Sequence, residues 1–253
     1  MTRAVPSPRP VFMVTDFGPC GPYLGQMHIA LVRTVPGLPV VDLINDMPRF
    51  SPRPAAYLLA ALAAAELEPA VFLAVVDPGV GTPQRRPVVV RAGRHAFVGP
   101  DNGLFNVIAR HHPEAERALI EWRPPALSDS FHGRDLFAPV AARLAAAQSV
   151  ATTPLPWQDH ELTDWPGDWP AVVYADGYGN LMTGLRAAGV PPSARIGAGG
   201  RELTRARTFG EVPAGSPFWY GNSSGLVELA VNGGSAAAEL GLAPGDAVRV
   251  VGG

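Results

Sequence analysis

Lysine is absent from this sequence of 253 residues, and all 20 of its basic side chains, histidine apart, are arginine. A P-loop needs a lysine that reaches the nucleotide phosphates, whereas pyridoxal phosphate enzymes and Schiff-base aldolases need a lysine amine. The sequence therefore excludes these three classes of enzyme. Any cationic side chain in a functional site must be arginine or histidine.

The sequence also lacks an excess of either charge, because its formal net charge is -2 and its isoelectric point is near 6.3. The arginines are scattered, so no basic stripe marks a nucleic-acid partner. Cys20 is the only cysteine, which excludes an intramolecular disulfide and a cysteine-rich metal site and suits a reducing compartment. The histidines show no metal-ligand spacing, so we expect a small-molecule partner, no nucleic acid and no metal.

Long apolar runs are missing as well. The longest helix-like run, Ala55–Ala65, is followed by Glu66 and falls short of the roughly 20 residues that a membrane span requires. The segment from Met1 to Pro10 is interrupted by proline and lacks the apolar core of a signal peptide. We therefore expect a cytoplasmic protein that does not bind a membrane.

Glycine and proline are abundant, at 28 residues each, while 47% of the sequence is hydrophobic. This composition argues against both a disordered chain and a helical bundle. Strand-like runs alternate with helical periodicity in the order β-α-β-α-β, which predicts an N-terminal α/β domain, residues 1–160, with a mostly parallel sheet. The predicted elements are Val11–Thr15, Tyr23–Val35, Val40–Ile44, Pro54–Glu66 and Val71–Val76, then strands Val88–Val90 and Ala96–Val98 and helices Gly103–His111 and Leu136–Ala146.

The pattern changes between Gln148 and Pro170, a segment rich in proline and tryptophan that we interpret as a linker. Beyond it, short β-like runs are separated by glycine-rich turns, and no long helix is predicted. This texture predicts a smaller all-β domain over residues 168–253. Its predicted strands are Ala171–Tyr174, Phe218–Tyr220, Val227–Val231 and Ala247–Val251.

Two acidic residues follow strands of the first domain. Asp16 comes directly after Val11–Thr15, and Asp77 directly after Val71–Val76. In an open α/β sheet, ligands bind at the carboxyl ends of the strands, so both carboxylates are expected at one edge of the sheet. Each alone is more often an Asx-turn or helix-capping residue than a functional one, but two on adjacent loops weaken that interpretation. The glycines after Asp16 lack G-x-G-x-x-G spacing, so a nicotinamide cofactor is not supported.

Three further segments could carry chemistry. His132, beside a glycine in a loop before a predicted helix, could act as a base or a hydrogen-bond donor, or could simply pack. Asp176 and Asn180 suit a β-turn, or a carboxylate for an ammonium group and an amide for a purine edge. Gly221–Gly225 matches the serine hydrolase pattern G-x-S-x-G, but the last histidine, His160, precedes it, which disfavours that class.

Taken together, the motifs resemble the S-adenosylmethionine (SAM) hydroxide adenosyltransferases, the adenosine-forming SAM hydrolases related to the fluorinase and chlorinase. The similarity covers nearly the whole chain in the family's order. The matching segments are TDFG at Thr15–Gly18, GPYLGQM at Gly21–Met27, VVDPGVG at Val75–Gly81, VGPDNGLF at Val98–Phe105, SFHGRDLFAPVAA at Ser130–Ala142, YGNLMT at Tyr178–Thr183 and NSSGLVELAVN at Asn222–Asn232.

The resemblance implies a fold and a reaction. The fold is an N-terminal Rossmann-like α/β domain joined to a C-terminal β-barrel, in a homotrimer whose active sites lie between neighbouring subunits. The reaction is hydrolysis of SAM to adenosine and L-methionine, by attack of water or hydroxide on the ribose C5′. Because a sulfonium is already a good leaving group, positioning and desolvating the water suffice, and no cofactor or metal is expected.

The resemblance also implies a role for each candidate residue. Asp77, Arg85 and His132 match the set that holds and polarises the water, although one extra residue before the double arginine leaves Arg86 as an alternative to Arg85. Asp16 would bind the ribose hydroxyls. The other assignments are Asp176 to the methionine amino group, Asn180 to the adenine, and Asn222, Ser223, Tyr220 and Glu228 to the methionine end.

Two other functions stay open. The related 5′-halogenases carry tyrosine where this sequence has Asp77, and His132-Gly133 replaces their halide-site Tyr-Ser, so hydrolysis is preferred. A protein that binds SAM or adenosine without turnover could dispense with the water-holding residues, which this sequence retains.

Overall fold

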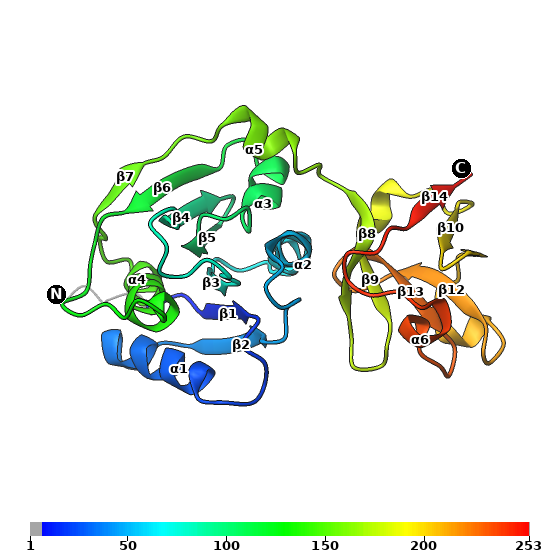
Figure 1. The fold of residues 1–253 in the computed structure, drawn as a ribbon, viewed down its shortest axis with the longest axis horizontal. Helices are drawn as coiled ribbons and strands as arrows, with labels where there is room; N and C mark the ends of the chain where they lie inside the picture. The colour runs from blue at the N-terminus through cyan, green and yellow to red at the C-terminus, as the bar shows by residue number, and fades with distance from the viewer. Residues whose placement is uncertain (1–6, 253) are drawn as a thin grey trace. The chain divides into compact units, whose positions relative to one another are not determined.

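The computed structural model describes residues 7–252, which divide into two compact units (Figure 1). Among the described residues, the first unit comprises residues 7–52 and 66–164, and the second comprises residues 53–65 and 165–252. Helix α2 (Pro52–Ala65) therefore belongs by its contacts to the second unit, although its sequence lies between strands of the first. The domain limits 1–160 and 168–253 stay a prediction.

A seven-stranded sheet forms the centre of the first unit, in the order β2-β1-β3-β5-β4-β6-β7. Strands β2, β1, β3 and β5 pair in parallel, whereas β4 pairs antiparallel with both of its neighbours and β7 pairs antiparallel with β6. The predicted mostly parallel sheet is therefore confirmed. The strands are β1 (Val11–Thr15), β2 (Val40–Ile44), β3 (Val71–Val75), β4 (Pro87–Ala92), β5 (His95–Pro100), β6 (Glu116–Ile120) and β7 (Thr152–Pro154).

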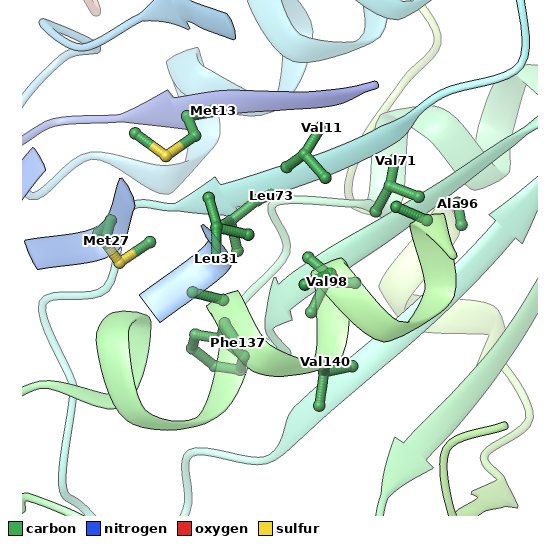
Figure 2. Close-up of a cluster of buried hydrophobic side chains, with 14 of the residues drawn as sticks. Val11, Met13, Met27, Leu31, Val71, Leu73, Ala96, Val98, Phe137 and Val140 are labelled. Carbon is green, nitrogen blue, oxygen red and sulfur yellow. The ribbon is translucent and has the colours of Figure 1, made fainter. Parts of the chain in front are cut away.

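Helices α1 (Tyr23–Thr34) and α4 (Ala138–Ala145) lie side by side and cover one face of this sheet (Figure 1). Met27 and Leu31, one turn apart on α1, are fully buried, as helical periodicity requires. They pack with Phe137 and Val140 against apolar side chains of β1, β3 and β5 (Figure 2). Strand β3 lies between the parallel strands β1 and β5 and is buried along its whole length, as is typical of a strand covered on both faces.

Three predictions for the first unit need correction. The first half of the expected linker belongs to this unit, because β7 pairs with β6 and the short helix α5 (Asp159–Thr163) begins with a capping box between Gln158 and Glu161. The helix predicted from Gly103 begins later, as α3 (Asn106–His111), and the helix predicted from Leu136 begins earlier. The first turn of this second helix is a π-helix, η1 (Gly133–Phe137), which continues into α4.

The second unit contains two antiparallel sheets, in the orders β12-β13-β9-β8 and β11-β10-β14. The absence of a long helix after residue 168 is confirmed for the described residues, since α6 (Ala236–Leu240) has five residues. Three strands escaped prediction because they are short or rich in glycine and charge. The strands are β8 (Trp169–Ala175), β9 (Leu181–Arg186), β10 (Arg195–Ala198), β11 (Arg201–Leu203), β12 (Pro217–Gly221), β13 (Leu226–Val231) and β14 (Arg249–Val251).

Helix α2 joins the second unit through aromatic contacts. The Tyr57 hydroxyl donates a 2.8 Å hydrogen bond to the Pro166 carbonyl, and its ring lies 5.4 Å from that of Trp169. Within residues 7–252, no helix is long and apolar enough to cross a membrane, and no group of three histidine, cysteine or acidic side chains is arranged to hold a metal ion.

Candidate active site

A cavity of about 210 Å³ opens at the carboxyl ends of β1 and β3 in the first unit. Asp16 and Asp77, which follow these strands, both line it. His132, the residue directly before the π-helical turn η1, lines it as well. The two strands are adjacent and parallel, so the residues that follow them emerge at one edge of the sheet. The structure thus brings together three residues that the sequence places far apart.

Asp77 and Arg85 form an ion pair at this cavity. Arg85 Nε lies 2.7 Å from Asp77 Oδ1, and the Asp77 side chain is only 3% exposed. The backbone N–H of Gly79 donates to the same oxygen at 3.1 Å. A Cβ at Gly79 would lie 2.3 Å from Arg85 Nη2, so glycine is needed there for the guanidinium to approach. The other oxygen, Asp77 Oδ2, is buried and accepts no hydrogen bond from the described residues.

Opposing effects act on the pKa of the Asp77 carboxyl group. Burial raises its pKa, whereas Arg85, the Gly79 N–H and, to a smaller extent, His132 lower it. A carboxylate with one oxygen fixed by a cation and the other unpartnered is suited to accept a hydrogen bond or a proton from a bound water.

The two neighbouring arginines have different partners. Arg85 contacts Asp77, whereas Arg86 Nη2 lies 2.5 Å from Asp101 Oδ2. Of the two, Arg85 is therefore the arginine at the candidate site.

Asp16 is partly buried and lines the same cavity. Its Oδ2 accepts a 3.0 Å hydrogen bond from the backbone N–H of Phe50. Burial raises the pKa of Asp16, the Phe50 N–H and Arg49 lower it, and the nearby Asp77 raises it further. Phe50 has a φ of 57°, a conformation unusual for a residue with a side chain, and is 73% exposed although it lines the cavity.

Aromatic side chains that the sequence analysis missed form one wall of the cavity. The rings of Phe17, Tyr23 and Phe131 contact one another with centroids 5.5 to 5.9 Å apart. Each of the three lies in one of the sequence motifs that carried the family resemblance. Their presence in these motifs was the sequence signal that could have identified them as site residues. Phe50 had no such signal, because its position depends on the fold.

His132 is placed by the turn that opens η1. Asp135 anchors this turn, because its carboxylate accepts from the Ser128 N–H at 3.0 Å and from Arg134 Nε at 2.6 Å. The hydrogen bond from Arg134 lowers the pKa of Asp135, which stays ionised. π-Helical turns are rare and occur frequently at functional sites.

A second group of predicted residues lies in the second unit, in the β8–β9 turn. The Asp176 carboxylate accepts three hydrogen bonds of 2.9 Å, from the backbone N–H groups of Tyr178 and Asn180 and from Asn180 Nδ2. Asn180 is buried. The turn therefore fixes both side chains, as expected for a β-turn.

The remaining predicted residues cluster around Glu228. The Tyr220 hydroxyl donates to Glu228 Oε1, and Asn222 Nδ2 donates to Oε2 at 2.8 Å. Burial raises the pKa of Tyr220, and the charges of Glu228 and Asp176 raise it further. Ser223 is exposed in the turn between β12 and β13. A strand follows this G-x-S-x-G segment, in place of the helix that a serine nucleophile requires.

Comparison with known proteins identifies relatives over nearly the whole chain. Residues 11–153 match the SAM hydroxide adenosyltransferase N-terminal domain, and residues 170–249 match the C-terminal domain of the same family. The (R)-S-adenosyl-L-methionine hydrolase of Thermus thermophilus is 40% identical, over 96% of this chain and 100% of the relative. The fluorinase of Actinopolyspora mzabensis is 24% identical, over 96% and 97%.

A solved structure shows the same fold. The crystal structure of an uncharacterized conserved protein from Thermotoga maritima superposes with a TM-score of 0.78 at 28% identity, and the match covers 96% of this chain and 100% of that one. These matches confirm the resemblance that the sequence motifs carried.

Proposed function

Because this chain belongs to the SAM hydroxide adenosyltransferase family, we propose that it hydrolyses SAM to adenosine and L-methionine without a cofactor. The observation that carries this proposal is the Asp77–Arg85 ion pair, which leaves one buried carboxylate oxygen unpartnered in a cavity shared with His132. A positioned carboxylate is what a water nucleophile requires.

The proposed reaction is a single displacement at the ribose C5′. A water oxygen forms the new bond to C5′ as the C5′–S bond breaks, and its electron pair stays on sulfur to give a neutral thioether. Because the leaving group departs uncharged, it needs no proton. Asp77 Oδ2 accepts a hydrogen bond from the water and takes its proton as the new bond forms, while Arg85 holds the carboxylate in place. His132, which lines the same cavity, orients the water.

The positive charge of the substrate suits the side chains that line the cavity. The sulfonium is a cation, and the cavity combines two carboxylates with the faces of several aromatic rings, both of which stabilise cations. Asp16 would bind the ribose hydroxyls, since its Oδ1 is not used by Phe50. Asp176, Asn180, Asn222, Ser223, Tyr220 and Glu228 would bind the adenine and methionine ends.

We further propose the finer features that the family implies. A Rossmann-like first domain is supported by the parallel pairing of β1 with β2 and β3. Closure of the second domain into a β-barrel is supported by isolated bridges, Ala171 to Ala247 and Arg205 to Trp219, which link the edges of its two sheets. Cys20, an exposed free thiol, supports the expected cytoplasmic location.

A homotrimer with sites between subunits is supported by an exposed apolar surface on the first unit. Val41 and Leu43 on strand β2, at the edge of the sheet, are 45% and 37% exposed. An unpaired strand edge with exposed apolar residues is an unfavourable surface for a monomer. A second copy of this chain would cover it.

Two alternatives are less well supported. A 5′-halogenase would have to hold a halide beside the Asp77 carboxylate, where like charges repel. A protein that only sequesters SAM would not need a buried, unpartnered carboxylate oxygen next to an arginine.

The test is to incubate the protein with SAM in water enriched in ¹⁸O and to analyse the products by chromatography and mass spectrometry. Attack at C5′ places one ¹⁸O in adenosine and none in methionine. The (R) descriptor in the name of the Thermus relative supports the (R) sulfonium epimer as the preferred substrate, so both epimers are assayed. Binding of SAM without adenosine would overturn hydrolysis, and a halide-dependent 5′-halo product would favour the halogenase.

A further inference from the structure

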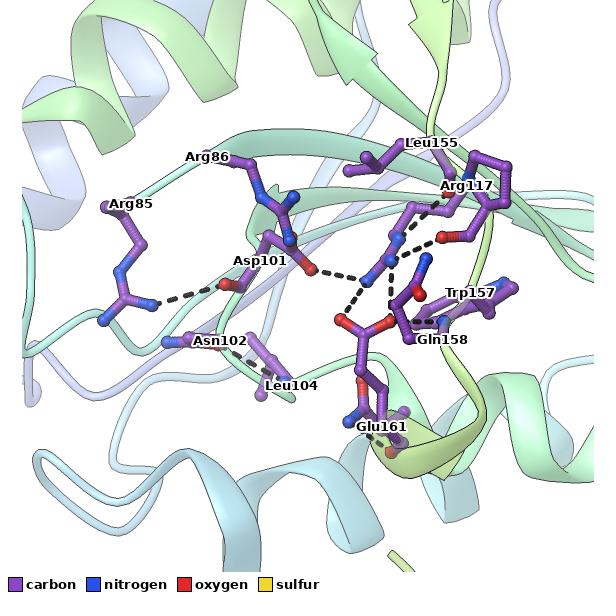
Figure 3. A network of polar contacts seen from close by, with 12 residues as sticks. Arg85, Arg86, Asp101, Asn102, Leu104, Arg117, Leu155, Trp157, Gln158 and Glu161 are labelled. Atoms are coloured by element: carbon purple, nitrogen blue, oxygen red, sulfur yellow. Dashed lines mark hydrogen bonds and ion pairs between the residues drawn. The ribbon is translucent and has the colours of Figure 1, made fainter. Parts of the chain in front are cut away.

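The loop after β5 contacts both chain segments that carry the Asp77–Arg85 pair. Asp101 contacts the segment that carries Arg85. Its backbone N–H donates to the Arg86 carbonyl at 2.9 Å, its carbonyl accepts from Arg85 Nη1 at 3.4 Å, and its carboxylate pairs with Arg86 (Figure 3). Arg85 is thus held between the Asp77 carboxylate and the Asp101 backbone.

The next residue, Asn102, contacts the segment that carries Asp77. Its Nδ2 donates a 2.8 Å hydrogen bond to the carbonyl of Val76, the residue directly before Asp77. Its Oδ1 accepts from the Leu104 N–H at 3.3 Å, which fixes the orientation of the amide (Figure 3). Two consecutive residues of one loop therefore contact the two members of the ion pair, Asp101 through its backbone carbonyl on Arg85 and Asn102 through its side chain on the residue before Asp77.

Asp101 is in turn fixed by a buried cation. Arg117, on β6, has a side chain that is 1% exposed and donates to Asp101 Oδ1 at 2.8 Å. It also forms two hydrogen bonds to Glu161, at 3.0 and 2.8 Å, and donates to the carbonyls of Leu155 and Pro156. Its guanidinium carbon lies 4.1 Å from the centre of the Trp157 ring. Every nitrogen of this guanidinium has a partner, so its position is determined.

A buried ion network of this kind is a weak source of stability, because desolvation offsets most of the attraction. Its benefit is a fixed geometry. The segments that it joins come from the loop after β5, from β6 and from α5, and it ends at Arg85 (Figure 3).

We propose that Asp101, Asn102 and Arg117 are positioning residues for the hydrolysis, which hold Arg85 against Asp77 without touching the substrate. This inference rests on the proposed function. Displacement of a reacting group by about 1 Å can lower a rate by about 10²-fold. We therefore expect Asp101→Asn and Arg117→Gln to lower kcat by about 10 to 100-fold and to leave KM for SAM within about 2-fold.

The readout that separates positioning from mere stability is the acid limb of the pH profile of kcat. The charged or titratable groups facing Asp77 are Arg85, His132 and Asp16. Arg85 lowers the pKa of Asp77, so an Arg85 that is no longer held beside it leaves that pKa higher. The acid limb should move to higher pH in Asp101→Asn and in Asn102→Ala.

Arg143→Gln is the matched control for Arg117→Gln. Arg143 also stacks on a tryptophan of the first unit, with its guanidinium carbon 4.2 Å from the Trp122 ring centre, and it takes no part in the hydrogen bonds of this network. We expect Arg143→Gln to lower the midpoint of thermal unfolding and to leave kcat per folded protein and the acid limb unchanged. Because Arg117→Gln can fail to fold, the isosteric Asp101→Asn is the deciding variant.

The pKa of Asp77 is also measured without substrate, by ¹³C NMR titration of its carboxyl carbon in the wild type and in Asp101→Asn. A higher pKa in the variant supports the proposal whether or not adenosine is formed. If wild-type protein makes no adenosine, the proposed hydrolysis fails, and the NMR comparison alone decides the positioning role. An unchanged pKa, or activity that falls only with the folded fraction while the acid limb stays in place, would overturn it.

Discussion

Arg85 Nε lies 2.7 Å from Asp77 Oδ1, and this pair leaves the second oxygen of the carboxylate buried without a hydrogen-bond partner among residues 7–252. Burial alone raises the pKa of Asp77, and Arg85 opposes this effect. The arginine therefore favours the ionised form of a carboxylate whose pKa is raised by burial. An ionised, partly desolvated carboxylate is a stronger base than one exposed to solvent.

Asp77→Asn should abolish most of the activity while preserving the shape of the site. The amide cannot accept a proton from water, so kcat is expected to fall by about 10²- to 10⁴-fold, the usual contribution of a general base. The measurement is adenosine formation under saturating SAM, with calorimetry to show that SAM still binds. A variant with wild-type kcat would remove Asp77 from the proton transfer.

Arg85→Gln and Arg86→Gln form a matched pair of neighbouring substitutions. Arg85 contacts Asp77, so its loss should lower kcat strongly and move the acid limb of the pH profile upward. Arg86 contacts Asp101 and is about half exposed, so its loss should have a smaller effect on both quantities. Equal effects of the two substitutions, measured side by side over pH 5 to 9, would contradict this assignment.

The sequence predicted the buried strands well and the polar ones poorly. Val71–Val76 is a continuous apolar run, and such a run has few alternatives to a strand within a sheet. Strand β6 (Glu116–Ile120) begins with two charged residues, and one of them, Arg117, is buried because Asp101 and Glu161 lie around it. Composition carries no information about such partners when they are 16 and 44 residues away.

The candidate site was predictable where its residues follow strands. Asp16 and Asp77 stand at strand ends in the sequence, and the fold places both at one cavity. The choice between Arg85 and Arg86 needed three-dimensional contacts, because the two side chains are chemically identical and adjacent. Phe50 was missed because its backbone conformation and its link to Asp16 depend on the packed loop.

Asp16→Asn should stabilise the fold at neutral pH. Burial raises the pKa of Asp16 in the folded protein above its unfolded value near 3.8, so the folded state binds a proton more readily than the unfolded state. The ionised carboxylate is thus unfavourable to folding at pH 7, and this effect fades as pH falls through the raised pKa toward 3.8. Asparagine can still accept the Phe50 N–H.

Thermal unfolding of both proteins between pH 7 and pH 3.5 checks this prediction. The variant should unfold at a higher temperature at pH 7, and the difference should disappear at the acid end. A constant difference at every pH would show that the charge of Asp16 is not its cause. Weaker binding of adenosine by the variant would agree with the ribose role proposed for Asp16.

Val41→Arg should dissociate the proposed trimer. Val41 is 45% exposed on edge strand β2, and a charge there opposes burial against a second copy. Val250→Arg is the control, because Val250 is 43% exposed on β14 of the other unit. Light scattering after gel filtration should give a lower mass for the first variant only. A wild-type monomer would contradict the assembly.

Tyr220→Phe should weaken binding of the methionine end more than it slows the reaction. The Tyr220 hydroxyl donates to Glu228, a buried carboxylate that keeps only its Asn222 partner once the hydroxyl is removed. A hydrogen bond to a charged group contributes about 1.5 to 3 kcal/mol, so KM for SAM should rise by about 10-fold or more. Calorimetry with the separate products provides the internal control, because methionine binding should weaken while adenosine binding, assigned to Asp16 and Asn180, stays as in the wild type. Equal weakening of both products would place Glu228 in a structural role.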